Sequence, residues 1–309
     1  MKKHIQKIIS FLLLTVNFSF FLQYKISGNT FITYAETNSN QGTETIIDSG
    51  KIFIHHINTV FYIEQSLYIR NRDKYSKDAL NKIYRNAKEK IYDRLGLNYT
   101  DGMETPIYIV NYGAAVFNYN DDGDKRITIG KDYIVNNQTL PHEMTHVLLL
   151  HKLGKANFEK LNFSINEGLA TQSESDFFES FSKKFILTFA IALDENIYFK
   201  NSCPDNTNIE VMCLYYTLHY YAIHDWIESE GKKVVEKFIE KVKNGEDSME
   251  SFRSLGGDKI IDKYNSEMKK LKPLAWIIKT ATSFCSNVRY FYGKICEFKA
   301  QLIKALQKI

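Results

Sequence analysis

The run His-Glu-Met-Thr-His at residues 142–146 constrains the fold more than any other feature of the chain. Its two histidines can bind one metal ion only if the run is helical, because residues i and i+4 of a helix share a face about one turn apart. Glu143 then lies beside both imidazoles, where its carboxylate can take a proton from a metal-bound water. The apolar residues Val147 and Leu148 give the helix a second face, which we expect to be buried.

Apolar periodicity predicts strands before this helix and further helices after it. β-Branched and aromatic residues indicate strands at 51–63, 106–112 and 126–134, with a hairpin turn signal at Asp122-Gly123. Helical periods, several ended by glycine, cover residues 75–96, 140–153, 164–178, 185–199, 211–229, 234–242, 247–255 and 258–271. This order predicts an α+β fold, with a small N-terminal mixed sheet and the active-site helix in residues 51–154, then a helical C-terminal subdomain in residues 155–272.

A third metal ligand is predicted in the run Asn-Glu-Gly-Leu-Ala at residues 166–170. Glu167 lies 21 residues after His146, so a turn and a second helix would return its carboxylate to the ion. A catalytic zinc ion usually has three protein ligands and one open position. We therefore expect His142, His146 and Glu167 to bind one Zn²⁺ per chain, with Glu143 acting as the base.

An HExxH run followed by Asn-Glu-Gly-(apolar)-Ala resembles the gluzincin metallopeptidases, which include thermolysin, the zinc aminopeptidases and small bacterial peptidase-MA-like domains. The resemblance covers roughly residues 51–272 and implies a zincin-like fold with the metal ligands and base given above. It also implies a tyrosine, near the start of a later helix, that stabilises the oxyanion. Tyr216 is the preferred candidate, and Tyr215 and Tyr220 remain alternatives because the sequence does not fix the helical register.

The chain departs from the family pattern at two places. Thermolysin-like relatives often have an acid four residues after the ligand glutamate, which orients a zinc-binding histidine. This chain has Thr171 at that position, and Glu174 or Asp176 could take the place of the missing acid. The aminopeptidases bind a free amine through Gly-x-Met-Glu-Asn, which residues 102–104 match only in part, so an endopeptidase is favoured. By analogy with these folds, we expect the strand at 126–134 to line the cleft and bind extended peptide.

Charge is unevenly distributed along the chain. Residues 1–35 contain four lysines and no acid, residues 269–309 contain nine basic residues and one acid, and the segment between is acidic. The leader has a basic start, an apolar run shorter than a membrane span and a small residue at Ala35. It predicts a signal peptide over 1–35, with an uncleaved anchor as the alternative, and a flexible polar segment over 36–50.

The tail, residues 273–309, mixes lysines with apolar side chains and predicts a basic amphipathic helix. Such a helix can contact an anionic membrane or cell-wall surface, or pack on the protein body. The formal net charge of +4 is too small to indicate a nucleic-acid partner. Usage rich in Lys, Ile, Asn and Tyr suggests an AT-rich bacterial genome, and the leader suggests secretion from, or display on, a Gram-positive bacterium. Nothing in the sequence indicates an oligomeric state.

Export permits disulfides, and four cysteines allow three pairings between which the sequence cannot choose. We favour Cys203–Cys213, which bracket a polar loop, over a bond between Cys285 and Cys296, and four free thiols are the alternative. Residues 118–124 resemble the start of a calcium loop. The twelfth position of that loop would be an isoleucine instead of the usual glutamate, so Ca²⁺ is not expected.

The predicted function is a secreted zinc metallopeptidase, favoured as an endopeptidase, that hydrolyses peptide bonds of a protein or peptide substrate through a zinc-bound water activated by Glu143. The alternative is a zincin-fold protein that is non-catalytic, or acts on a non-peptide amide, and binds a surface partner through its basic tail. His219, one turn from Tyr216, is a candidate either for assisting at the oxyanion or for packing in the core.

Overall fold

A computed structural model of the protein describes residues 43–100, 103–113, 115–120, 124–135, 139–174, 183–193 and 209–273. The first of these residues build a six-stranded sheet in the order β1-β2-β3-β4-β6-β5. The strands are β1 (Thr43–Asp48), β2 (Lys51–His56), β3 (Phe61–Glu64), β4 (Ile107–Val110), β5 (Val116–Tyr119) and β6 (Lys125–Gly130). The pairs β3–β4 and β4–β6 are parallel and the others are antiparallel. The sheet is therefore mixed, as the sequence predicts.

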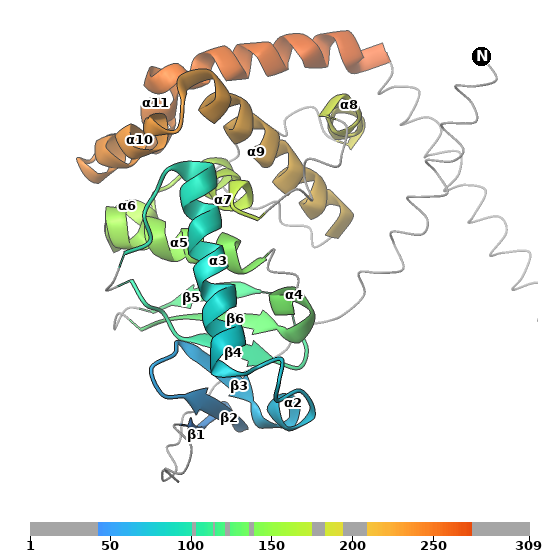
Figure 1. Cartoon of the computed structure of the whole chain (residues 1–309). Helices are drawn as coiled ribbons and strands as arrows, with labels where there is room; N and C mark the ends of the chain where they lie inside the picture. Colours follow the sequence, from blue (N-terminus) through green and yellow to red (C-terminus); the bar gives the residue numbers. More distant parts are fainter. Residues whose placement is uncertain are drawn as a thin grey trace, which may run out of the picture.

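Helices dominate the chain after β6. The helices are α2 (Gln65–Arg70), α3 (Lys77–Leu95), α4 (Lys131–Val135), α5 (Thr139–Leu153), α6 (Lys155–Phe158), α7 (Phe163–Gln172), α8 (Lys183–Leu193), α9 (Ile209–Glu230), α10 (Lys233–Lys243), α11 (Ser248–Phe252) and a π-helical turn η2 (Arg253–Gly257). Residues 258–273 are also helical. In Figure 1, α5 lies between the sheet and the later helices α9, α10 and α11, and the long helix α3 runs from the level of α7 down across the sheet in this view. The structure is mixed α/β and consistent with the α+β prediction.

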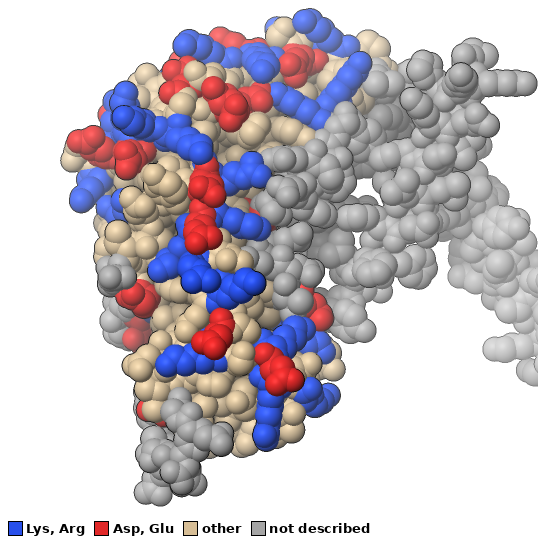
Figure 2. Space-filling model, viewed as in Figure 1, with Lys and Arg blue, Asp and Glu red and all other residues tan. Residues whose placement is uncertain are grey.

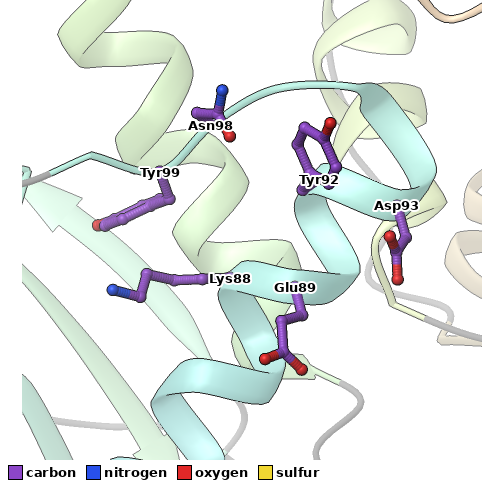
Figure 3. A pocket seen from close by; sticks show the side chains of 6 residues that line it. All are labelled: Lys88, Glu89, Tyr92, Asp93, Asn98 and Tyr99. Carbon is purple, nitrogen blue, oxygen red and sulfur yellow. The ribbon is translucent and has the colours of Figure 1, made fainter.

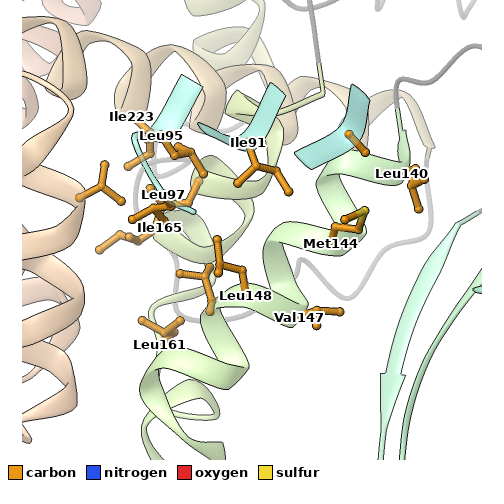
Figure 4. Packing of buried hydrophobic residues seen from close by; sticks show 14 of the residues in the cluster. Ile91, Leu95, Leu97, Leu140, Met144, Val147, Leu148, Leu161, Ile165 and Ile223 are labelled. Atoms are coloured by element: carbon orange, nitrogen blue, oxygen red, sulfur yellow. The ribbon is translucent and has the colours of Figure 1, made fainter. Parts of the chain in front are cut away.

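Apolar packing holds the helix α5 in place. Its residues Met144, Val147 and Leu148 are fully buried. Figure 4 shows them among side chains of the neighbouring segments, including Ile91 of α3 and Ile165 of α7. Burying a large apolar side chain contributes about 1.5–3 kcal/mol, so this packing fixes where the polar side of α5 lies.

Local signals in the sequence account for the helix ends that were predicted correctly. The Ser76 hydroxyl accepts a hydrogen bond from the Ala79 N–H at the start of α3, and Gly96 ends it with a φ of 71°. Gly231 ends α9 in the same left-handed conformation, with a φ of 79°. Left-handed backbone after a helix favours glycine because glycine has no Cβ to clash.

Three predictions about the strands are wrong. The predicted flexible segment 36–50 contains β1, which pairs along its whole length with β2. The predicted strand 51–63 is two strands, because the chain turns through Asn58 at a φ of 67°. The predicted strand 126–134 ends at Gly130, and α4 follows. A Cβ on Gly130 would lie 2.2 Å from the Gly113 carbonyl oxygen, so the chain passes too close here for a longer side chain.

The described surface shows no single-sign stripe on the face that contains α3. Figure 2 shows Lys and Arg side chains interspersed with Asp and Glu along this face. An uninterrupted basic stripe would be the electrostatic footprint of a nucleic-acid site.

Among the described residues, none of the helices has the length and apolar character needed to cross a membrane.

Two ion pairs to the partly buried Asp225 connect α8, α9 and the helix at 258–273. The Asp225 carboxylate accepts hydrogen bonds from Lys183 and, at 3.0 Å, from Lys263. Burial alone would raise the pKa of Asp225, but the hydrogen bonds from these two lysines hold it below its usual value. A carboxyl group with a lowered pKa in the folded state stabilises the protein above its unfolded pKa, and this stabilisation is lost as the pH falls through the folded pKa.

Asp225→Asn is therefore expected to lower the free energy of unfolding by about 1 kcal/mol at pH 7, because the partly buried Lys183 and the half-exposed Lys263 lose a charged acceptor. The difference from wild type should shrink as the pH falls below about 4 and through the folded pKa. Urea unfolding at pH 7 and at low pH measures both effects. Asp258→Asn is the matched control. Its side chain is 67% exposed, so this substitution should change the free energy of unfolding only slightly. An equal cost at both pH values would contradict the role given to the Asp225 charge.

Candidate metal centre

Two helices bring the three predicted metal ligands together. His142 and His146 lie one turn apart on α5, Glu167 lies on α7, and all three side chains are buried. The two Nε2 atoms are 3.1 Å apart. Oε2 of Glu167 lies 3.3 Å from Nε2 of His142 and 3.7 Å from Nε2 of His146. Three donor atoms from residues distant in sequence therefore face one point, and this cluster could hold a metal ion.

The spacing of these donor atoms fits a small transition-metal ion. Tetrahedral ligands at about 2.0–2.1 Å from an ion lie about 3.3–3.4 Å from one another. The observed separations of 3.1, 3.3 and 3.7 Å lie around this value. Oε2 of Glu167 is buried and makes no hydrogen bond within the described residues, so it is an acceptor that lacks a partner. A set of two imidazoles and one carboxylate suits a transition metal, whereas Ca²⁺ and Mg²⁺ prefer oxygen ligands.

Each histidine has a second contact through its other ring nitrogen. Nδ1 of His146 donates a hydrogen bond to Oδ1 of Asn166 at 3.1 Å, which leaves the Nε2 lone pair directed at the cluster. Nδ1 of His142 lies 3.7 Å from Oε1 of Glu174, at ion-pair distance. Glu174 was one of the two predicted substitutes for the acid missing at Thr171. The role of Asn166 was not predicted, although the residue adjoins the ligand glutamate and the motif includes it.

Asn166→Leu is expected to weaken binding of a divalent transition metal, with Zn²⁺ as the probe, by about 10–100-fold, because His146 loses the acceptor that fixes its tautomer and ring orientation. Asn166→Asp keeps an oxygen at the same place and should remain within a few-fold of wild type. Competition with a chromophoric chelator measures both affinities. Equal affinities for wild type and Asn166→Leu would show that the hydrogen bond does not orient the ligand.

Burial and charge shift the ionisation of the cluster. Burial raises the pKa of Glu143, and His142 and His146 only partly offset it. For Glu167, burial acts in the same direction, but the nearby charges of His146 and His142 dominate and lower its pKa. Burial alone would lower the pKa of His142, but Glu174 and Glu167 raise it. Glu167 is thus held ionised where it could bind a metal ion, while Glu143 has the raised pKa that suits a general base near neutral pH.

Of the three candidate tyrosines, Tyr216 is the one that faces the cluster. Its half-buried ring lies 5.9 Å, between centroids, from the ring of His142. Tyr215 is 4% exposed and lies against His219, while Tyr220 is 1% exposed and stacks on His224. The structure thus supports Tyr216 by position and places the other two in the packed interior.

A glycine sets the distance between α7 and α9. A Cβ on Gly168 would lie 2.4 Å from Cγ1 of Ile223 and 3.0 Å from the carbonyl oxygen of His219. Only glycine lets the two helices approach so closely without a shift of the backbone. Because Gly168 follows Glu167 directly, this contact fixes α9, and with it Tyr216, next to the metal ligand.

Hydrogen bonds join α5 to the end of α7. The hydroxyls of Thr145 and Ser173 lie 2.7 Å apart, so one of them donates to the other. Both also lie within hydrogen-bond distance of the Pro141 carbonyl oxygen, Thr145 at 2.8 Å and Ser173 at 3.1 Å. The ligand-bearing helices are therefore connected by polar contacts as well as by packing.

Two predictions about substrate binding, the peptide-binding strand and the aminopeptidase motif, are not supported by the structure. The strand expected to bind peptide was 126–134, but β6 is paired on both sides, with β4 and β5, and this prediction is wrong. The edge strand on that side of the sheet is β5. In the partial aminopeptidase motif at 102–104, Met103 is buried, and its carbonyl oxygen accepts a hydrogen bond from the Tyr99 hydroxyl. This contact gives Met103 a structural role.

A surface hollow lies away from the ligands, at the end of α3. Figure 3 shows the residues that line it: Lys88, Glu89, Tyr92, Asp93, Asn98 and Tyr99. None of the three cluster residues, His142, His146 and Glu167, contributes to it. The segment expected to be a polar hairpin turn, rather than a calcium loop, does join two antiparallel strands, β5 and β6. Ile129, at the twelfth position of such a loop, is fully buried in β6.

Several predictions fall on residues that the structure does not describe. These are the leader 1–35, the tail from residue 274 onward, Asp176, Cys203, Cys285 and Cys296. The backbone of Cys213 lies in α9, but its side chain is likewise outside the description.

Comparison with known proteins gives no further assignment: no protein-family model matches the chain, and no curated protein matches it.

Proposed function

We propose that the protein is a secreted zinc metallopeptidase with a zincin-like fold and one Zn²⁺ bound by His142, His146 and Glu167. The observation that carries the proposal is the convergence of these three donors from α5 and α7. Glu143 is buried on the same helix beside both histidines and is only 6% exposed. Three protein ligands with an adjacent carboxylate are the arrangement of a catalytic site, whereas structural zinc usually has four closed ligands.

When bound, zinc would lower the pKa of a water molecule to about 7 and polarise the carbonyl group of the substrate. Glu143 would accept the proton of the attacking water and later deliver it to the leaving amine, a role that its raised pKa favours. The Tyr216 phenol would donate a hydrogen bond to the negative charge that develops on the carbonyl oxygen. The second contacts of His142 and His146 keep both rings oriented throughout.

The edge strand β5 favours an extended peptide as the substrate. The described order of the sheet leaves one side of β5 unpaired with any other strand, and this strand packs near α5. A peptide can add to such an edge through main-chain hydrogen bonds. The partial amine-binding motif at 102–104 is accounted for by the contact of Met103, so an endopeptidase remains favoured over an exopeptidase.

The proposal is tested by measuring bound zinc and cleavage of a mixed peptide library, before and after treatment with a chelator. We expect about one zinc per chain, loss of cleavage after chelation and recovery when zinc is added back. If the protein binds zinc but cleaves no peptide, it would instead be an enzyme acting on a non-peptide amide or a binding protein. If the purified protein binds no zinc even after incubation with the metal, the proposal is wrong.

A further inference from the structure

His219 on α9 is a buried polar side chain without a polar partner. It is 4% exposed, and neither ring nitrogen makes a hydrogen bond to any of the described residues. Its ring neighbours are Phe163, edge-on at 5.9 Å, and Tyr215 at 6.0 Å. Buried polar groups are nearly always hydrogen-bonded, so an imidazole with two orphan nitrogens requires an explanation.

The position of His219 points to the metal ligand Glu167. The close contact at Gly168 places the backbone of residue 219 directly against α7, one residue after Glu167. Burial lowers the pKa of His219 to about 4, and Glu167 is near enough to act in the opposite direction. Whether neutral or charged, an imidazole ring has at least one N–H to donate.

Glu167 has the complementary deficiency. Its Oε2 is a buried acceptor with no hydrogen bond in the described part of the chain, and it faces His142 and His146. A carboxylate that ligates a metal is usually hydrogen-bonded in turn by an outer partner, which fixes its orientation. His146 has a hydrogen-bond partner in Asn166, and Nδ1 of His142 lies 3.7 Å from Glu174, whereas Oε2 of Glu167 has no hydrogen bond in the described part of the chain.

We propose that His219 is a positioning residue for Glu167, and that its ring N–H hydrogen-bonds the Glu167 carboxylate when the metal is bound. The inference rests on the proposed metal site and assigns a role that the sequence left open. His219 is 4% exposed whereas Tyr216 is half-buried, so Tyr216 is the better placed of the two to reach a substrate carbonyl oxygen. Tyr216, one turn earlier on α9, faces the cluster instead.

The test compares the full chain with His219→Leu, which has no donor, and His219→Gln, which keeps one. Zinc affinity is measured by chelator competition, and thermal unfolding is followed on the same proteins after chelation. For His219→Leu we expect a 10–100-fold weaker affinity for zinc but an unchanged or higher unfolding midpoint after chelation, because the orphan nitrogens are gone. His219→Gln should bind zinc within a few-fold of wild type.

A residue that only packs would give the opposite pattern, a lower midpoint with unchanged zinc affinity, and this result would overturn the inference. His219→Phe, which also lacks a donor, serves for the same comparison where His219→Leu does not fold. Failure of wild type itself to bind zinc would instead refute the proposed metal site. The two failures are therefore distinguishable.

Discussion

Glu143→Gln is expected to lower the turnover number for peptide cleavage by about 10²–10⁴-fold while leaving the zinc content at the wild-type level. Glutamine has nearly the same shape as glutamate but cannot take a proton from the attacking water. The metal ligands are unchanged, because Glu143 does not belong to the cluster formed by His142, His146 and Glu167. The site should therefore stay assembled and lose only its base.

The measurement pairs zinc content with cleavage rates for wild type and for Glu143→Gln. Glu159→Gln is the control, because that side chain is 49% exposed and makes only a surface ion pair with Lys155. It should change neither quantity. Full activity of Glu143→Gln would require a different base, and loss of zinc from this variant would mean that Glu143 supports the ligands instead of the chemistry.

The ligand set could be predicted from the sequence because it depends mainly on local rules. The i, i+4 spacing of His142 and His146 has one geometric meaning on a helix. Glu167 required one further assumption, that the following helix folds back, and the packing of α7 on α5 confirms it. Helix ends were equally local, as Ser76 and Gly96 show for α3.

The tyrosine could not be chosen from the sequence, because its position depends on a contact between distant segments. Tyr215, Tyr216 and Tyr220 are similar in local context, and the register of α9 against α7 selects among them. That register is set where Gly168 meets Ile223 and the backbone of His219. A glycine inside a helical pattern is an ambiguous signal, since it weakens the helix as well as permitting close approach.

The strands were the least predictable elements for a similar reason. The polar composition of β1, Thr-Glu-Thr-Ile-Ile-Asp, resembles a loop, and only its pairing with β2 makes it a strand. The order of the sheet places β6 between β4 and β5, which no periodicity within residues 126–134 could reveal. The peptide-binding role predicted for that stretch failed because edge position is a property of the whole sheet.

His146→Ala is expected to weaken zinc binding by more than the 10–100-fold that an outer partner contributes, and to abolish cleavage, because one of three ligands is lost. Zinc that binds only the folded state stabilises it by about 2.7 kcal/mol at a free concentration of 100 times Kd. The unfolding midpoint of wild type should therefore rise when zinc is added. The midpoint of His146→Ala should not rise at the same zinc concentration.

His151→Ala is the matched control, since that residue lies on the same helix and is exposed near its end. It should keep the zinc content, the cleavage rate and the zinc-dependent rise in the midpoint. The stability measurement matters because it does not depend on knowing the substrate. If the unfolding midpoint of His146→Ala still rises with zinc, the metal binds elsewhere. If that rise is lost in His146→Ala while Glu143→Gln still binds zinc, the residues that hold the metal are distinct from the residue that takes the proton.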